Sequence, residues 1–307
     1  MNPLAAAEAH PRTAAVVGAL AIAFSGIFYL WSGVSPSTGV FFRCLYGLPI
    51  LLLVAWGEWR TQGPMSRRTI ALCILAGVFF AGDLITFHYA VDVIGAGLGT
   101  VMGNVQVVIV ALVAWVVFGE RPRREVLIAL PIMLFGVFLI SGVVGTGAYG
   151  SDPVLGVQIG LITAATYAGY LLVIRRAAPD RRPAGPVAIA TGVTGLCALL
   201  FGAAVGDIEL VPTLPAHGYL LALGILSQSV GYLVIQASLP RLPAVITSVL
   251  LLVQPVTTIL LGAILLAELP SAFQLLGVTL VIVGIALATG ALRRILGHAT
   301  GKRPATA

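Results

Sequence analysis

Two charged residues lie inside long apolar stretches of the sequence. Arg43 falls within residues 36–57 and Asp83 within residues 69–91, and neither stretch holds another Asp, Glu, Lys or Arg. As helices, these stretches place Arg43 about 10 Å and Asp83 about 12 Å from the same side of the molecule. We expect the two side chains to approach each other or to share a polar network, which lowers the cost of both charges. Such a pair either fixes helix packing or binds a substrate or a proton, and both roles stay open.

His88 lies five residues beyond Asp83 in the same stretch. Because histidine titrates near neutral pH, these two side chains are candidates for a proton relay, and the alternative is a hydrogen-bonded structural histidine. No second histidine or acidic pair lies at metal-ligand spacing, so we expect no metal site. We also expect no catalytic residue, since no nucleophiles converge at one depth.

Uncharged polar and aromatic residues recur at helical spacing in several other stretches. Gln228 and Tyr232 lie four residues apart, and so do Thr163 and Tyr167, so each pair shares one helix face. We expect this set to line a central cavity, and the alternative is hydrogen bonding between packed helices. The full set is Asn104, Gln106, Thr163, Tyr167, Tyr170, Gln228, Tyr232, Gln254 and Thr258. Gln106 and Gln254 each lie roughly 16 Å into their stretch, near the middle of a bilayer.

Aromatic rings also follow helical spacing. Phe24 and Phe28 lie one turn apart, and Phe79 and Phe87 flank Asp83. We expect Phe24, Phe28 and Phe79 to help wall a pocket suited to an amino acid with a large side chain, and the alternative is ordinary packing or contact with lipid.

Small residues and one proline suggest where helices move. Gly95, Gly99 and Gly103 form a small-residue face that permits close helix approach. Pro255 removes an amide donor from the middle of its stretch. We expect Gly99, Gly103 and Pro255 to act as hinges, although packing alone also explains them.

The composition identifies the elements that hold these residues. The chain has 307 residues, of which 59% are hydrophobic and only 9% charged, and its mean hydropathy is +1.06. So few charges cannot cover a soluble domain of this length, whereas a lipid-embedded helical protein needs few. We predict an all-α polytopic membrane protein with ten transmembrane helices. The ten apolar segments are approximately 13–33, 36–57, 69–91, 95–118, 125–145, 153–174, 185–206, 216–238, 243–266 and 271–292.

The basic residues support this count. With ten spans, sixteen of the seventeen Lys and Arg residues fall on one side of the membrane, and Arg43 is the exception. The positive-inside rule then places both termini in the cytoplasm of a bacterial cell, with the protein in the inner membrane. The net charge of +6 therefore reflects topology and a lipid bilayer partner, and we expect no binding of nucleic acid.

The two halves of the chain align at a constant offset of 148 residues. Residues 96–142 match residues 244–290 without a gap, pairing Gln106 with Gln254 and Glu120 with Glu268. Five spans per half give the second copy the opposite orientation, an arrangement typical of secondary transporters. We therefore expect two inverted five-helix repeats, residues 1–145 and 146–294, followed by a disordered cytoplasmic tail over residues 295–307.

The second repeat resembles the EamA-type repeat of the drug/metabolite transporter superfamily. The residues that carry this resemblance are Pro255, Glu268, Gly277 and Gly284, and the first repeat matches through Arg43 and Glu120-Arg121-Pro122. Val107 departs from the pattern, since the second repeat has Pro255 there. The resemblance implies a central cavity between the first, third, fourth, sixth, eighth and ninth segments. It extends to bacterial exporters of amino acids, including aromatic ones.

These observations together favour a secondary transporter that exports amino acids or related small metabolites by alternating access. No nucleotide-binding loop or redox motif is evident, so we expect no cofactor, and protons are the candidate coupling ion. The alternatives are a permease for drugs or other metabolites, an uncoupled facilitator or channel, and an intramembrane enzyme. The last needs convergent nucleophiles or metal ligands, so we expect the protein not to be an enzyme.

Overall fold

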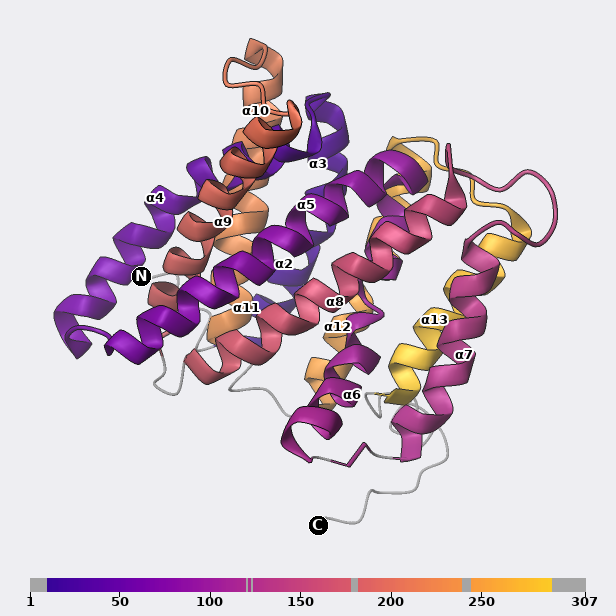
Figure 1. The fold of residues 1–307 in the computed structure, drawn as a ribbon, viewed down its shortest axis with the longest axis horizontal. Coiled ribbons are helices and arrows are strands. Elements are labelled where there is room, and N and C mark those ends of the chain that lie inside the picture. Colours follow the sequence, from indigo (N-terminus) through magenta and orange to yellow (C-terminus); the bar gives the residue numbers. More distant parts are fainter. Residues whose placement is uncertain (1–9, 120, 123, 178–181, 239–243, 289–307) are drawn as a thin grey trace.

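A computed structural model describes residues 10–119, 121–122, 124–177, 182–238 and 244–288 (Figure 1). All regular elements in these ranges are helices, which agrees with the predicted all-α fold. Glu120 and the predicted tail over residues 295–307 lie outside the described residues. The helices are α2 (Pro11–Ala23), α3 (Ser25–Ser32), α4 (Pro36–Gln62), α5 (Arg67–Gly103), α6 (Gln106–Phe118), α7 (Arg124–Ile140), α8 (Pro153–Ala177), α9 (Ala184–Val205), α10 (Leu214–Ala222), the π-helix η1 (Leu223–Gly231), α11 (Tyr232–Ser238), α12 (Ala244–Leu265) and α13 (Ala272–Ala288).

These helices cover all ten predicted apolar segments. Within the described residues, six helical runs are long and apolar enough to cross a membrane by themselves, and two shorter apolar helices cover Val253–Leu265 and Ala272–Ala288. The third segment and the start of the fourth form α5, whose backbone leaves helical geometry at Gly95. The chain is therefore a polytopic helical membrane protein, but several of its spans are interrupted.

The first segment is interrupted at Phe24, where α2 gives way to α3. The apolar segment 13–33 predicts one continuous helix, so this break differs from the prediction. A break inside a membrane frees backbone carbonyls that need new donors. The Ser227 hydroxyl donates to the Ala21 carbonyl at 2.9 Å, and the Thr258 hydroxyl donates to the Ala23 carbonyl at 3.1 Å. Side chains from η1 and α12 thus stabilise the broken helix.

The fourth and eighth segments are also irregular near their middles. The fourth breaks between α5 and α6 at Asn104, whose side-chain amide donates to the Thr100 carbonyl at 2.8 Å and so competes with regular helix bonding. The eighth contains η1, where the Ser229 hydroxyl donates to the Gly47 carbonyl at 2.8 Å. π-Helical turns of this kind occur frequently at functional sites.

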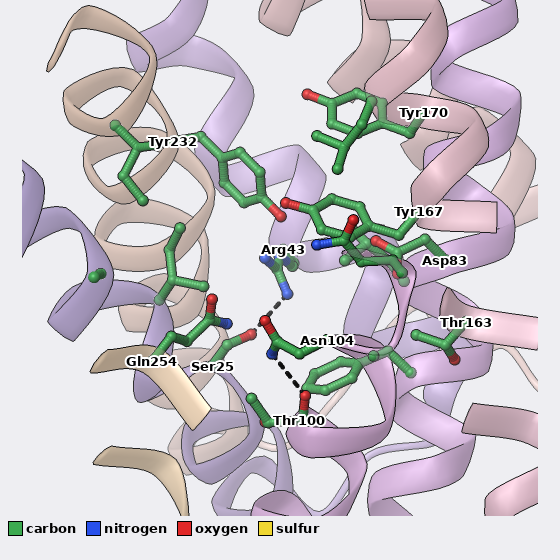
Figure 2. Close-up of a pocket in the computed structure, with 18 of the residues that line it drawn as sticks. Ser25, Arg43, Asp83, Thr100, Asn104, Thr163, Tyr167, Tyr170, Tyr232 and Gln254 are labelled. Atoms are coloured by element: carbon green, nitrogen blue, oxygen red, sulfur yellow. Dashed lines mark hydrogen bonds between the residues drawn. The ribbon is translucent and has the colours of Figure 1, made fainter. Parts of the chain in front are cut away.

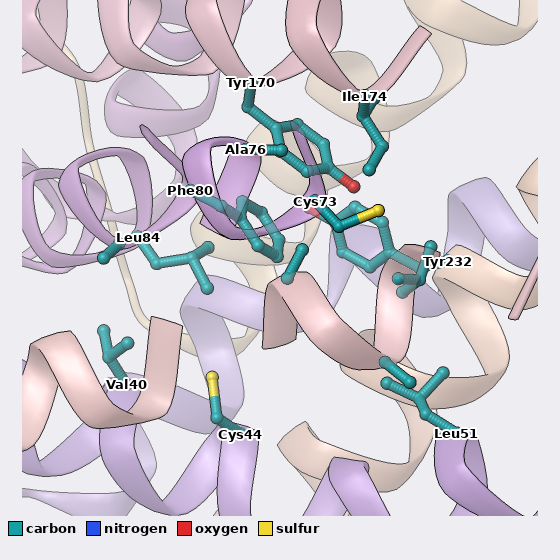
Figure 3. Close-up of a cluster of buried hydrophobic side chains, with 14 of the residues drawn as sticks. Val40, Cys44, Leu51, Cys73, Ala76, Phe80, Leu84, Tyr170, Ile174 and Tyr232 are labelled. Atoms are coloured by element: carbon teal, nitrogen blue, oxygen red, sulfur yellow. The ribbon is translucent and has the colours of Figure 1, made fainter. Parts of the chain in front are cut away.

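The core of the molecule lies around α5, which crosses between α8 and α9 (Figure 1). Figure 3 shows this cluster, in which Val40 and Cys44 of α4 lie near Leu84 of α5. Phe80 stacks on Tyr170 with ring centroids 4.4 Å apart. Large aliphatic side chains elsewhere point outward, as Leu53 does with 67% of its surface exposed, which lipid tolerates and water does not.

Helices α7 and α13 pair closely at the edge of the molecule (Figure 1). A Cβ atom on Gly277 would lie 2.5 Å from the Gly136 carbonyl oxygen, and one on Gly136 would lie 2.7 Å from the Gly277 carbonyl oxygen. Because backbone atoms cannot rotate away as side chains can, only glycine permits this crossing.

We therefore expect Gly277→Ala to lower the free energy of unfolding by about 1–3 kcal/mol through overpacking. Thermal unfolding of the purified protein in detergent measures the change. Gly57→Ala is the matched control, since a Cβ atom on Gly57 meets nothing within 4 Å. Equal melting temperatures for Gly277→Ala and the wild type would contradict the packing described.

Candidate transport cavity

A cavity of about 190 Å³ lies between the interrupted helices (Figure 2). It exceeds the cavity of about 150 Å³ that accommodates benzene in an engineered protein. Its walls come from α2, α3, α4, α5, α6, α8, α11 and α12. Among the residues predicted from the sequence, those in the walls are Arg43, Asp83, Gly103, Asn104, Gln106, Thr163, Tyr167, Tyr170, Tyr232 and Gln254. Helices from both halves of the chain therefore contribute polar groups to one cavity.

Arg43 is 1% exposed and reaches into this cavity from α4. Its Nε donates to the Gln228 side-chain oxygen at 2.8 Å, and its Nη1 donates to the Ser25 hydroxyl at 2.8 Å. Gln228 in turn donates through its Nε2 to the Thr191 hydroxyl at 2.8 Å. These bonds fix the guanidinium with neutral partners from η1 and α3, and they leave its positive charge without a counter-ion among them.

Asp83 is 6% exposed and lines the same cavity. The expectation that Arg43 and Asp83 lie near each other agrees with this placement. Among the described residues, however, no Arg43 nitrogen lies within the 4.0 Å of an Asp83 oxygen that defines an ion pair. The Arg43 guanidinium and the Asp83 carboxyl group thus line one cavity without forming a direct ion pair.

Tyrosine side chains surround the two charges. The Tyr167 and Tyr232 hydroxyls point toward each other near Asp83 and Arg43 (Figure 2). Tyr170 stacks on Tyr167 with ring centroids 5.8 Å apart. Its hydroxyl is buried and has no hydrogen-bond partner among the described residues. An unpaired buried hydroxyl is costly, and this one borders the cavity.

The neutral polar residues divide into two groups. Asn104, Gln106 and Gln254 line the cavity, as does Thr163, whose hydroxyl bonds the Thr86 hydroxyl at 2.8 Å. The remaining two residues, Gln228 and Thr258, lie outside the walls. Gln228 instead bonds Arg43, which lines the cavity. Gln228 lies in the π-helix η1, so the α-helical spacing used to predict its direction does not apply.

His88 also lies outside the cavity walls, contrary to expectation. Five residues at 100° each place it about 140° around the helix from Asp83. It is fully buried and stacks on Tyr29 with ring centroids 3.9 Å apart. Its Nδ1 lies 3.4 Å from the Pro36 carbonyl oxygen. This environment is that of a packed structural histidine.

Three of the predicted aromatic residues also lie away from the cavity. Phe24 and Phe28 stack on each other with centroids 5.6 Å apart and pack with the cluster around Ile27. Phe79 packs against Gly169, where a Cβ atom would lie 2.6 Å from its ring. Phe87 is the phenylalanine that lines the cavity.

The predicted hinge residues differ from the breaks in the structure. Gly99 and Gly103 keep helical geometry, and α12 runs through Pro255 as one element. The interruption occurs instead at Gly95, with φ of 82° and ψ of 166°. A side chain is unfavourable there, because a Cβ atom would also lie 2.7 Å from the carboxyl group of Glu268.

The Glu268 side chain contacts the backbone of α5 directly after this break. Its two oxygens accept the backbone N–H groups of Ala96 at 2.5 Å and Gly97 at 2.9 Å, and it is 2% exposed. Ala267, with φ of 53°, turns the chain so that Glu268 points back at α5. Burial raises the pKa of Glu268, and the two N–H donors counteract part of that rise. We call this contact the Glu268 clasp.

Several wall residues were not predicted. Ser25 and Thr100 add hydroxyls, and Ala15, Ala19 and Ile22 form an apolar strip on α2. The spacing of these α2 residues, three or four apart, is the helical signal that identifies them in retrospect. Among the described residues, no group of three or more His, Cys, Asp or Glu is placed to hold a metal ion.

We expect Gln228→Leu to lower the free energy of unfolding by about 1.5–3 kcal/mol, because it leaves a charged Arg43 donor unpaired in the interior. Gln158→Leu is the matched control, since Gln158 is exposed. Thermal unfolding in detergent measures both. A loss of stability in the control as large as in Gln228→Leu would mean that the Arg43 bond is not its cause.

Comparisons with known proteins give the family. The model of the EamA-like transporter family matches residues 13–142 and again residues 154–290. An uncharacterized transporter of Bacillus subtilis (strain 168), YwfM, is 27% identical over 256 residues, covering 82% of this chain and 84% of its own. One protein of known crystal structure has the same fold with a TM-score of 0.62 at 18% identity, covering 92% of this chain and 98% of its own. The chain therefore belongs to the EamA-like transporter family.

Proposed function

We propose that this protein is a secondary transporter that exports amino acids or related small metabolites across the bacterial inner membrane. The observation that carries the proposal is one cavity, built from interrupted helices, whose walls include the Arg43 guanidinium and the Asp83 carboxyl group. Secondary transporters place substrate at such interrupted helices near the bilayer midplane. Such a site binds and releases a solute without a reaction, so we propose no enzymatic activity.

The two ends of the cavity differ. At the Gly95 end, the Glu268 clasp joins α12 to α5, and Gly97 packs against Ile259. At the other end, the walls are the apolar side chains of Ala15, Leu171 and Ile235. The basic loops favour a cytoplasmic location for this second end. We therefore infer an inward-facing state, in which an exporter loads its substrate.

Alternating access then requires the Glu268 clasp to open. We propose that the repeats 1–145 and 146–294 move against each other as this contact breaks and the cytoplasmic end closes. A substrate gradient or protons supply the energy. The inverted orientation of the repeats gives each one the role that the other has in the opposite state.

Counterflow in proteoliposomes tests the function. Vesicles that contain purified protein and unlabelled L-phenylalanine should accumulate external labelled L-phenylalanine transiently and with saturation, at two pH values. Empty vesicles are the control, and other amino acids and dipeptides extend the panel. Exchange of other metabolites without any amino acid would overturn the substrate class. Unsaturable flux far above carrier rates would indicate a channel.

The clasp is tested by reagent access to the cavity. Thr100→Cys, in a chain whose three native cysteines are alanine, reports the exposure of the cavity to an impermeant thiol reagent added on the periplasmic side. We expect Glu268→Ala to raise the labelling rate about tenfold, as a shift of about 1.4 kcal/mol toward the open state implies. Glu209→Ala, at an exposed acid near the same end, should leave the rate unchanged. Equal rates in both variants would contradict a gating role for the clasp.

A further inference from the structure

We propose that the cavity recognises a zwitterion, with Arg43 binding the carboxylate of the substrate and Asp83 binding its ammonium group. The inference rests on the proposed function and specifies how the same site selects its substrate. Each charge then finds its counter-ion in the substrate rather than in the other side chain.

The first support is that both side chains are deeply buried and make no direct ion pair within the described residues. Arg43 and Asp83 are 1% and 6% exposed, and a charge at such depth is costly unless it is paired. The hydrogen-bond partners of Arg43, Gln228 and Ser25, are neutral. No ion pair joins it to Asp83 within the described residues. A packing pair would close this gap, whereas a binding site needs it open.

The second support is the number of free donors on Arg43. A guanidinium has five N–H groups in one plane, and the bonds from Nε and Nη1 use two of them. The Nη2 group makes no hydrogen bond to the described part of the chain. Because Gln228 and Ser25 hold the plane in place, the remaining donors form a preorganised site for a carboxylate.

The third support is the surroundings of Asp83. The Tyr167 and Tyr232 hydroxyls point toward each other beside Arg43 and Asp83 (Figure 2). An ammonium group has three donors and no acceptor, which suits a carboxylate flanked by hydroxyl oxygens. The α-carboxylate and α-ammonium groups of an amino acid are separated by one carbon, so one molecule presents both charges to the cavity that Arg43 and Asp83 line.

The rest of the cavity suits an apolar side chain. From the charged centre, Ala15, Ala19 and Ile22 line one wall, and Leu171 and Ile235 line another. No charged group other than Arg43 and Asp83 is among the described wall residues. The buried Tyr170 hydroxyl offers one additional polar contact. The selected class is therefore α-amino acids with apolar or aromatic side chains.

Three ligands with the same side chain test this assignment. L-phenylalanine carries both charges, 2-phenylethylamine lacks the carboxylate, and 3-phenylpropionate lacks the ammonium group. The dissociation constant of each ligand is measured on the purified full chain in detergent, for the wild type, Asp83→Asn and Arg43→Gln. Asp152→Asn and Arg60→Gln, at exposed positions, are the matched controls. Size-exclusion profiles and melting temperatures establish that each variant is folded.

The expected result is a crossed pattern. The wild type should bind L-phenylalanine at least about tenfold more tightly than either analogue, since a bond to a charged group is worth that much. Asp83→Asn should weaken the binding of L-phenylalanine about tenfold or more and leave the dissociation constant of 3-phenylpropionate unchanged. Arg43→Gln should weaken the binding of L-phenylalanine and of 3-phenylpropionate, which both carry a carboxylate, and leave the binding of 2-phenylethylamine unchanged. If Arg43→Gln does not fold, Asp83→Asn alone tests the assignment, by comparing the binding of L-phenylalanine with that of 3-phenylpropionate.

The opposite outcomes are equally definite. If Asp83→Asn weakens all three ligands alike, or none of them, the zwitterion assignment is wrong. If the wild type still shows counterflow of L-phenylalanine in that case, only the zwitterion assignment fails and the proposed function stands. If the wild type neither binds nor exchanges any amino acid, the proposed function itself fails. Unchanged binding in Asp152→Asn and Arg60→Gln attributes the effects to the cavity.

Discussion

Burial of an unneutralised arginine in the membrane interior is the constraint on which the rest of the site depends. Arg43 lies on α4, but the groups that hold it come from α3 and η1. Ser25 begins α3, directly after the break in the first helix, and Gln228 lies in the π-helix η1. The interruptions in turn free carbonyls that Thr258 and Ser227 must satisfy. The contacts of one buried charge thereby involve both of these irregular spans.

Backbone groups freed by a helix break also need partners near Gly95. A helix that restarts inside the protein has backbone N–H groups without partners, and Glu268 from the other repeat accepts two of them. The clasp therefore stabilises the closed end by satisfying groups that would otherwise be unpaired. In the opening that we propose, water can replace the carboxylate. A contact with such a substitute can be broken and remade, which a transporter gate requires.

Much of the fold could be predicted from the sequence, because ten apolar segments and the asymmetry of the basic residues are properties of composition and order. The polar wall of the cavity could also be predicted in part: Asp83 from its charge inside an apolar stretch, Gln254 from its depth, and Tyr167 from helical spacing. Spacing failed where the helix changes its period, as at Gln228 in η1. The prediction was also wrong for His88, because a separation of five residues turns it about 140° around the helix from Asp83. The position of the break at Gly95 depends on a contact with Glu268, 173 residues away, which no local pattern contains.

The central claim is that the space between Arg43 and Asp83 is the transport site. A structure of the protein determined with bound L-phenylalanine tests it most directly. The account predicts density for the amino acid in this cavity, with its carboxylate on Arg43, its ammonium group on Asp83 and the Glu268 clasp closed. Density for the ligand elsewhere, or a direct Arg43–Asp83 ion pair with the ligand bound at another place, would contradict it.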